Sequence, residues 1–247
     1  MPEVFRDDFN TSPLNPGKWR VYDDVNPNER TFFGTTPILR TEAGLSFYRF
    51  FLHRYNPEHH TPAPGFFKGT EIYSFPFEIT KRPNVGGYVE LETRLRGTAV
   101  PSGAVAAFFT YSTIGSGSTG DEIDFEFVGK LGPHSVWLNT WNDSAQSHTT
   151  YTNAAFNWQS NWNTYKIRWV TDAGNTRYVE WYINGALVRT ARNPEHIPDD
   201  GMQIHFNSWV PDNTWPEAYD ANLKPALNQA SDFTWYYDVD YIVVRTG

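Results

Sequence analysis

The sequence predicts an all-β protein, a sandwich of two antiparallel sheets. In several segments apolar and polar residues alternate with the period of a strand, whereas helical periodicity is nearly absent. Gly, Asn and Pro recur at short intervals between these segments, as they do where a chain reverses. About a dozen short strands without a linker or a fixed repeat favour one sandwich over a propeller. We therefore expect a single domain over residues 1–247.

The clearest strands lie at 88–96, 165–169 and 178–183, where apolar residues alternate with polar ones, so each should bury one face. Asn184-Gly185 follows the third of these strands and precedes another apolar stretch, which is the pattern of a tight β-hairpin. Segments 53–65 and 210–231 mix proline, polar and aromatic residues and do not fit a strand. Loops of this length usually border a functional site.

Composition limits the classes of partner. Aromatic residues make up 17% of the chain and charged residues 19%, which is typical of a folded protein and not of a disordered one. The net charge of −8 offers no basic surface to nucleic acid or to an anionic membrane. No apolar run approaches the roughly 20 residues of a membrane span. The absence of cysteine excludes disulfides, a thiolate nucleophile and zinc–sulfur sites.

Residues 120–129 contain the sharpest chemical signal. The period of a strand places Glu122, Asp124 and Glu126 on one face and their apolar neighbours on the other. Like charges at neighbouring positions of one face repel each other, and no Lys or Arg follows until Lys130. Such repulsion is expected where perturbed pKa values serve a reaction.

Glycoside hydrolysis is a reaction that needs two carboxyl groups beside one bond, roughly 5–5.5 Å apart when configuration is retained. Positions such as Glu122 and Glu126 have backbones about 13 Å apart on a strand, so the side chains would have to lean together over a curved sheet. Asp124 between them would hydrogen-bond one and fix its protonation state. The competing interpretation is a solvated strand face whose acids keep the protein soluble.

The segment Glu122-Ile123-Asp124-Phe125-Glu126 resembles the E-x-D-x-E signature of glycoside hydrolase family 16. That family groups lichenases, laminarinases, xyloglucan-active enzymes, agarases and carrageenases. Segments 87–111, 207–209 and 237–241 resemble other lichenase strands in the same order, so the resemblance covers most of the chain except 53–65 and 210–231. The signature lacks the extra residue found before the second Glu in the bulged branches. It is thus similar to lichenases and plant xyloglucan enzymes.

The resemblance implies a concanavalin-like jelly roll with a substrate cleft across a concave sheet. It also implies that residues 1–247 form a single catalytic domain, with a retaining mechanism and no catalytic cofactor. Glu122 would be the nucleophile, Asp124 its assisting carboxylate and Glu126 the acid/base. The substrate-binding positions implied by the same alignment are Glu71, Tyr73, Phe109, Tyr111, Asn139, Trp141, Asn207 and Trp209.

The residue types suit sugar binding, because an aromatic ring stacks on the apolar face of a pyranose and an amide bonds its hydroxyl groups. Asn139 and Trp141 are two residues apart, as are Asn207 and Trp209, so each pair projects from one strand face. Trp215 and Tyr219 in the second long loop would add walls to the cleft.

Two positions depart from the lichenase pattern. Gly120, at the end of the glycine-rich stretch 115–120, stands where that pattern has Trp, and Tyr73 stands where it has Arg. Both departures put the transfer of linkage specificity in doubt.

The metal signals are weaker. Some lichenases hold a structural calcium, and the matching positions are Asp240 and the carbonyls of Asp8 and Gly44. The residues Glu58, His59 and His60, with His53, lack the spacing of a metal motif, so we expect a surface loop there.

The first functional hypothesis is a retaining endo-β-glucanase acting on mixed-linkage β-1,3-1,4-glucan. The second is action on xyloglucan or another β-1,4-glucan, by hydrolysis or transglycosylation. A lectin-like carbohydrate-binding module is the alternative without catalysis, and the three carboxylates argue against it. We expect a polysaccharide substrate, no nucleic-acid or membrane partner, a monomer, and secretion after removal of a leader.

Overall fold

The computed structural model describes residues 2–25, 29–61, 65–79, 82–112 and 120–247. Within these ranges the helices are three short 3-10 turns, and no helix is long and apolar enough to cross a membrane. The elements in chain order are β1 (Glu3–Asp7), β2 (Trp19–Val21), β3 (Thr31–Phe32), β4 (Ile38–Glu42), β5 (Leu45–His53), β6 (Phe67–Lys68), β7 (Thr70–Ser74), β8 (Gly87–Gly97), β9 (Val105–Tyr111), β10 (Glu122–Val128), η1 (Gly129–Leu131), β11 (Ser135–Asn142), β12 (Ala145–Thr152), β13 (Asn163–Thr171), β14 (Arg177–Ile183), β15 (Ala186–Ala191), η2 (Pro194–His196), β16 (Gln203–Trp209), η3 (Gln229–Ser231) and β17 (Thr234–Thr246).

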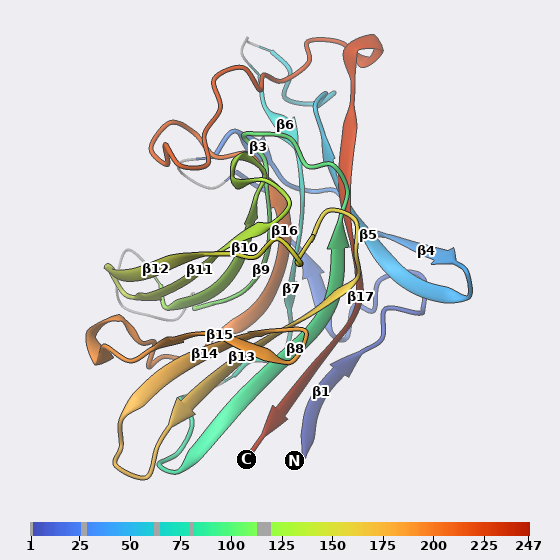
Figure 1. Ribbon diagram of the computed structural model, residues 1–247. Coiled ribbons are helices and arrows are strands. Elements are labelled where there is room, and N and C mark those ends of the chain that lie inside the picture. The colour runs from blue at the N-terminus through green and yellow to red at the C-terminus, as the bar shows by residue number, and fades with distance from the viewer. Residues whose placement is uncertain (1, 26–28, 62–64, 80–81, 113–119) are drawn as a thin grey trace.

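In the described ranges these strands form two sheets. The ten-stranded sheet has the order β15-β14-β13-β8-β17-β5-β6-β3, with β1 beside β17 and β4 beside β5. The seven-stranded sheet has the order β12-β11-β10-β9-β16-β7-β2. Figure 1 shows the sheets packed face to face, with both ends of the chain at the same end of the sandwich. The predicted all-β sandwich is confirmed, whereas a single catalytic domain over 1–247 stays a prediction.

The predicted strands at 88–96, 165–169 and 178–183 lie within β8, β13 and β14. Asn184 and Gly185 join β14 to β15 with φ angles of 50° and 81°. Positive φ at both central residues defines the tight hairpin turn whose twist matches the strands, and Asn-Gly is the pair that adopts it most readily. The predicted hairpin is therefore confirmed.

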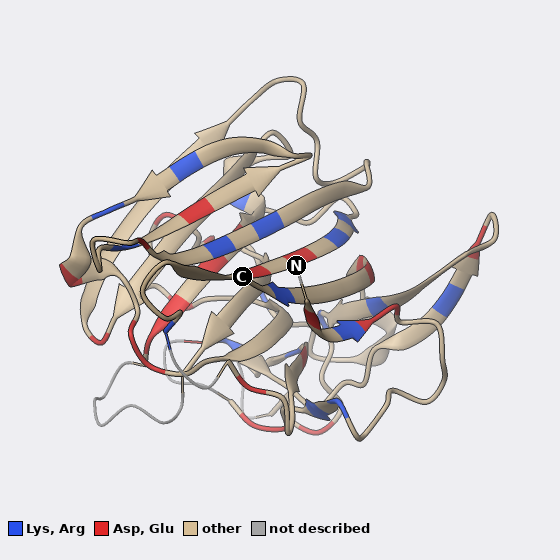
Figure 2. Cartoon of the chain, turned by 90° about the horizontal axis from the view of Figure 1, so that it is seen from below, with Lys and Arg blue, Asp and Glu red and all other residues tan. Residues whose placement is uncertain are grey.

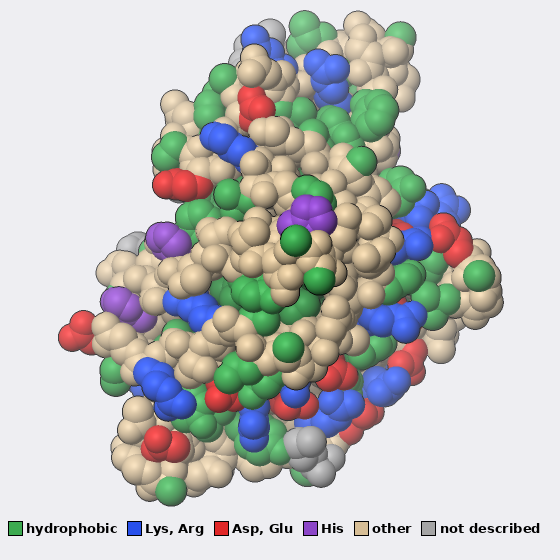
Figure 3. Space-filling view, in the orientation of Figure 1, with side chains coloured by type: hydrophobic (Ala, Val, Ile, Leu, Met, Phe, Trp, Pro, Cys, Tyr) green, Lys and Arg blue, Asp and Glu red, His purple; other side chains and the backbone are tan. Residues whose placement is uncertain are grey.

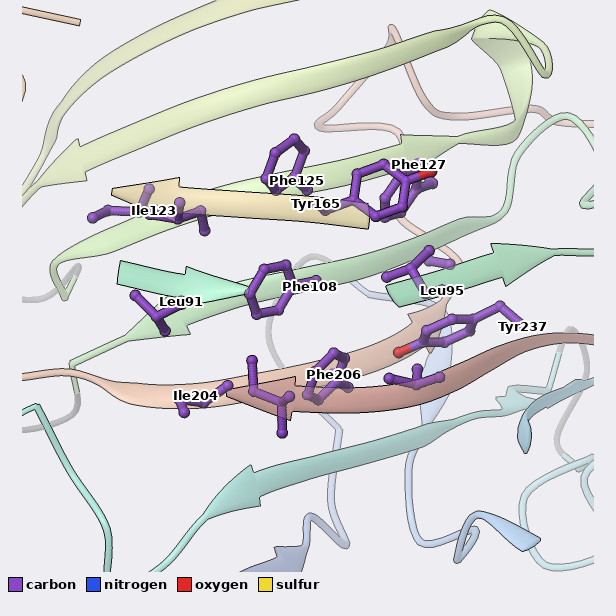
Figure 4. Close-up of a cluster of buried hydrophobic side chains, with 14 of the residues drawn as sticks. Leu91, Leu95, Phe108, Ile123, Phe125, Phe127, Tyr165, Ile204, Phe206 and Tyr237 are labelled. Atoms are coloured by element: carbon purple, nitrogen blue, oxygen red, sulfur yellow. The ribbon is translucent and has the colours of Figure 1, made fainter. Parts of the chain in front are cut away.

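Aromatic side chains fill the space between the sheets (Figure 4). Phe125 and Phe127 of β10 are fully buried. Both meet the ring of Tyr165 on β13 edge-on, with ring centroids 5.3 and 4.9 Å away. Edge-to-face contact is a favoured geometry for aromatic rings. Because strand side chains alternate, this packing directs the carboxylates of β10 to the opposite face.

Donors from the ten-stranded sheet also bond backbone carbonyls of the other sheet. The indole Nε1 of Trp181 on β14 donates to the carbonyl of Asp124 at 2.9 Å. The guanidinium of Arg189 on β15 donates to the carbonyl of Leu138 on β11, and burial lowers its pKa to about 10. These bonds fix the strand of acids and its neighbour from behind.

The outer face of the ten-stranded sheet carries paired charges of opposite sign. Asp238 on β17 is fully buried and pairs with Arg49 at 2.7 Å and Arg96 at 2.9 Å. Glu42 contacts the same two guanidinium groups. Figure 2 shows acidic and basic residues on neighbouring strands, and Figure 3 shows the two kinds mixed toward the lower right of the molecule. Acidic residues on this face thus have cationic partners.

Trp181→Phe tests the bond behind the strand of acids. Trp169→Phe is the matched control, because Trp169 is equally buried but its Nε1 has no hydrogen-bond partner among the described residues. Both changes leave a similar cavity, and only the first also removes a hydrogen bond. We expect Trp181→Phe to lower the free energy of unfolding by about 1–2 kcal/mol more than the control, measured by chemical denaturation. Equal losses would show that the bond adds nothing.

Candidate active site

The acidic face is the outer face of the seven-stranded sheet, on which Glu122, Asp124 and Glu126 project from β10. This strand lies between β9 and β11 in the middle of the sheet. The register sets the predicted residues in rows that run across the strands. Tyr111 and Trp141 lie beside Glu122, and Phe109 and Asn139 lie beside Asp124, with Tyr73 further along the same row. Asn207 and Glu71 lie in the row of Glu126, and Trp209 lies in the row of Val128. All eleven residues predicted for catalysis and substrate binding therefore share one face of one sheet. Their roles stay predictions.

Much of this outward face is nevertheless buried. Asp124 is 1% exposed, Asn139 4% and Glu71 5%, although none of them lies between the sheets. A flat outer face would be open to water, so the curvature of the sheet and its covering loops must enclose it. The half-buried rings of Tyr111 and Trp141 lie at the edge of this enclosed floor. We infer from this burial a cleft with a polar floor.

The loop 210–231 forms one wall of the cleft. Trp215 stacks on Trp209 with ring centroids 5.8 Å apart and meets Trp137 edge-on at 5.5 Å. Ala218 is fully buried in the same small apolar cluster. The predicted wall role thus fits the position of Trp215.

Two basic side chains hold this loop by its backbone. Arg30 donates to the carbonyls of Pro211, Asp220 and Leu223, and Lys130 donates to those of Pro216 and Tyr219. The ring of Tyr219 lies 4.7 Å from the Arg30 guanidinium, which ties it to the same support, and its role as a wall of the cleft stays a prediction. These side-chain hydrogen bonds satisfy carbonyl groups of the loop, as the backbone hydrogen bonds between neighbouring strands do in a sheet.

Burial raises the pKa of all three carboxyl groups on β10. The pKa of Glu122 rises to about 7, chiefly through desolvation; the charge of Glu71 adds to the rise and contact with Asp124 opposes it. The pKa of Asp124 rises well above its usual range through desolvation and then the charges of Glu122 and Glu126. The pKa of Glu126 also rises well above its usual range, through desolvation and then the charge of Glu122. The three groups interact closely, and burial favours the protonated form of each.

Asp124 is placed to influence Glu122. Neither carboxylate oxygen of Asp124 has a hydrogen-bond partner among the described residues, and its contacts with Glu122 and Asn139 lie outside hydrogen-bond geometry. The contact between the two carboxyl groups raises the pKa of Asp124 and lowers that of Glu122, whereas the contact with Asn139 lowers the pKa of Asp124. A proton held by Asp124 thus stabilises the charged form of Glu122.

Buried polar atoms without a hydrogen-bond partner gather on the acidic face. Within the described residues they include Oδ1 and Oδ2 of Asp124, Oδ1 of Asn139 and of Asn207, Nε2 of His205 and Nε1 of Trp137. Leaving one such atom unpaired costs about 1–3 kcal/mol, and native proteins leave few of them. Their concentration on one face marks a surface arranged for a function other than folding.

Sequence reasoning missed two residues of this face, His205 and Trp137. Each lies two positions before a predicted residue of its own strand, Asn207 on β16 and Asn139 on β11. The same alternation that paired Asn207 with Trp209 identifies both. Nδ1 of His205 lies 2.9 Å from Oε1 of Glu71.

The backbone explains the departure at Gly120. A Cβ atom there would lie 1.9 Å from the carbonyl oxygen of Ser112, so no larger residue fits this conformation. Residues 115–119 of the glycine-rich stretch lie outside the described residues. The next side chain, Asp121, is 2% exposed and accepts hydrogen bonds from the backbone N–H groups of Asp143, Asp199 and Asp200. The start of β10 is therefore fixed on both sides of the chain.

The predicted calcium residues lie away from this face. Asp8 follows β1, Gly44 lies between β4 and β5, and Asp240 belongs to β17 of the other sheet. The Asp240 carboxylate pairs with Arg94 at 2.9 Å and the Asp8 carboxylate with Arg6 at 2.6 Å. Among the described residues no three His, Cys, Asp or Glu side chains are grouped as metal ligands.

The histidine-rich loop has partners of its own. His59 stacks on Phe32 with ring centroids 3.8 Å apart, and Glu58 pairs with Lys68 at 3.3 Å. Nδ1 of His53 lies 2.9 Å from the hydroxyl of Thr234. These contacts agree with the surface loop expected there.

Glu122→Gln tests the cost of burying these charges. The pKa of Glu122 in the folded protein, about 7, lies above its ordinary value of 4.5. The folded state therefore binds the proton more tightly than the unfolded state, and the stability that this gives is lost as pH rises between these two values. We expect the variant to be more stable than the wild type by roughly 1–3 kcal/mol at about pH 8, and no more stable at about pH 4. Denaturation curves at both pH values check this, and a gain that does not depend on pH would contradict it.

Comparisons with known proteins agree with this geometry. The sequence model of glycosyl hydrolases family 16 matches residues 79–230, from just before β8 to the long loop after β16. The match includes nearly all of loop 210–231, which the resemblance drawn from the sequence had left out.

Relatives and solved structures extend the comparison. The β-glucanase of Bacillus subtilis (strain 168) is 32% identical over 123 residues, covering 50% of this chain and 47% of that protein. Endo-1,3-1,4-β-glycanase ExoK of Rhizobium meliloti (strain 1021) is 29% identical over 126 residues, covering 51% and 44%. The chain spans about half the length of the curated relatives it matches. The solved Bacillus licheniformis β-glucanase shares the fold, with a TM-score of 0.71 and 21% identity over 97% of this chain and 96% of that one. Because the family match covers more than half of the sequence, the chain belongs to glycosyl hydrolases family 16.

Proposed function

We propose that the chain is a retaining endo-β-glucanase that hydrolyses mixed-linkage β-1,3-1,4-glucan. The observation that carries the proposal is the row of three mutually interacting carboxyl groups on the floor of a cleft. Membership of the family and the activities named for its relatives support it. A pure sugar-binding module has no use for three acids that repel one another, which argues against the lectin-like alternative.

The order of the acids in the E-x-D-x-E segment assigns the two steps of the reaction. Glu122, the first of them, attacks the anomeric carbon in its ionised form. Burial raises the pKa of Glu126 well above its usual range, so it holds a proton and gives it to the departing glycosidic oxygen. In the second step Glu126 takes a proton from the water that displaces Glu122 from the sugar, so configuration is retained. Asp124 holds a proton beside Glu122 and stabilises its carboxylate whenever it is free. The steps use only carboxyl groups and water.

The surroundings of the acids suit a neutral polysaccharide. Half-buried rings such as Trp141 and Trp209 offer flat apolar faces, and the buried amides of Asn139 and Asn207 lie on the same floor. An uncharged glucan is not repelled by the negative face, whereas a polyanion would be.

Two positions bear on which glucan backbone and linkage the cleft accepts. Gly120 and Tyr73, the two departures from the lichenase pattern, flank the acids and the Glu71 end of the cleft. The direct test is release of reducing ends from barley glucan, laminarin, xyloglucan and chitin side by side. Barley glucan cleaved fastest supports the proposal, and xyloglucan cleaved fastest favours the β-1,4 alternative. Tight binding without cleavage of any glucan would favour the lectin-like module.

We further propose that the protein is secreted and works as a monomer. A polymeric glucan lies outside the cell, which supports secretion. Charged side chains on the outer face of the ten-stranded sheet, among the described residues, are paired within the chain and offer a second copy few free charges to bind, which supports a monomer.

Azide rescue tests the two catalytic roles separately. Glu122→Ala leaves the acid in place, so azide attacks the anomeric carbon from the empty side and should give the α-glycosyl azide with an activated aryl β-glucoside. Glu126→Ala still forms the covalent intermediate, so azide should displace Glu122 and give the β product. Both unrescued variants are expected to lose at least about a thousandfold in kcat on glucan. The same anomer from both variants, read by NMR, would contradict the assignment.

The structural calcium predicted from the sequence stays a prediction, and one contact at its site argues against it. Calcium prefers six to eight oxygen ligands, and Asp240, the one carboxylate of the predicted ligand set, is already paired with the guanidinium of Arg94. The melting temperature of the protein is therefore expected to be the same, within about 1 °C, in EDTA and in millimolar calcium. A rise of several degrees with calcium, in differential scanning calorimetry, would restore the ion to the site.

A further inference from the structure

His205 is the residue of the acidic face for which the proposed reaction gives no role. It lies on β16, between the strand of acids and β7, in the same row as Asp124, Phe109 and Tyr73. We infer that His205 is a positioning residue, which holds the carboxylate of Glu71 at the angle at which that carboxylate binds a glucose unit beside the cleaved bond. The inference rests on the proposed function and adds to it a residue that does not touch the substrate.

The geometry at Glu71 fixes both of its oxygens from one strand. Nδ1 of His205 lies 2.9 Å from Oε1, and Nδ2 of Asn207 donates to Oε2 at 3.2 Å. His205 and Asn207 are two positions apart on β16, so their side chains point the same way. A carboxylate oxygen accepts more than one hydrogen bond, so each oxygen keeps capacity for a sugar hydroxyl. Glu71 is thus oriented and still able to bind.

Aromatic rings hold the imidazole itself in place. Tyr73 stacks on it with ring centroids 5.6 Å apart, Phe109 lies at 4.8 Å and Tyr111 meets it edge-on at 6.0 Å. His205 is 6% exposed, which leaves no room for its ring to turn. Four of the eight residues predicted to bind substrate therefore contact this one side chain.

The second ring nitrogen shows how His205 acts. Nε2 is buried and has no hydrogen-bond partner among the described residues, although the other nitrogen is well placed on Glu71. Because this nitrogen is buried, it offers no contact to a sugar in the conformation described. His205 therefore acts on the sugar through Glu71, whose charge is also felt at Glu122.

The experiment compares two substitutions of His205 alone and with Glu71→Gln. His205→Leu keeps an apolar side chain among the rings and removes the donor. His205→Asn keeps a donor close to the position of Nδ1. Steady-state kinetics on barley glucan are expected to show KM raised about tenfold in His205→Leu, with kcat within about threefold of the wild type. The reason is that the weakened contact, between Glu71 and the sugar, stabilises the bound substrate and the transition state alike. KM of His205→Asn is expected to stay within about threefold of the wild type.

The double variant shows whether the effect passes through Glu71. In the background of Glu71→Gln, the Leu substitution is expected to raise KM by less than about twofold more, since its target is already lost. His134→Leu is the matched control, because His134 bonds the carbonyl of Phe156 at the turn before β11 and should leave KM unchanged. Melting temperatures confirm that each variant is folded, and the Asn variant keeps the test open if the Leu variant fails to fold.

The outcomes separate this inference from the proposed function. Suppose that the wild type is active. An unchanged KM in His205→Leu, or an equal rise in KM with Glu71 and with Glu71→Gln, would then overturn the role of His205 and leave the proposed function standing. If the wild type cleaves no glucan, calorimetric binding of a mixed-linkage glucan oligosaccharide to the same variants decides. A tenfold weaker Kd in His205→Leu supports the inference, and no binding by the wild type overturns both.

Discussion

The burial of Phe125 and Phe127 between the two sheets is the constraint on which the rest of the molecule depends. Alternation along β10 means that these rings cannot enter the core without turning Glu122, Asp124 and Glu126 outward together. A slip of one residue would place carboxylates among aromatic rings, so the register is held by the whole core. The indole of Trp181 adds a bond to the backbone of the same strand. The acids therefore keep their spacing although they repel one another.

The two outer faces of the sandwich deal with negative charge in different ways. On the ten-stranded sheet, arginine side chains neutralise buried carboxylates such as Asp238 directly. On the acidic face the described residues give the carboxyl groups of β10 no arginine or lysine partner, and burial raises the pKa values of these groups instead. A guanidinium partner would stabilise the ionised form and remove the bound proton that acid catalysis needs. Carboxylates on one face are thus kept ionised and paired, while carboxyl groups on the other face are kept able to hold protons.

The sequence predicted the part of this structure that follows from local periodicity. The all-β class, the hairpin at Asn184-Gly185 and the common face of the three acids depend on residues close together in the chain. The wall made by loop 210–231 depends on Arg30, which lies far away in the sequence and donates to backbone carbonyls of the loop. Because every residue has a carbonyl, no pattern of side chains predicts this contact. His205 is not predicted for a related reason, because its role depends on a contact with Glu71, which lies on a neighbouring strand. At the predicted calcium site, the arginine partner of Asp240 is Arg94 on the neighbouring strand β8, and local sequence does not indicate that contact.

The close approach of Gly120 to the carbonyl of Ser112 limits how this cleft can evolve. Any side chain at Gly120 would push against the backbone of the preceding segment. The position two residues before Glu122 is therefore closed to single substitutions, even to alanine, unless the backbone on both sides moves. Variation in what the cleft accepts beside Glu122 must come from the adjacent strands β9 and β11, where Tyr111 and Trp141 flank it. A lineage with this glycine would thus change its preference for sugars through substitutions on the neighbouring strands, while the strand of acids stays the same.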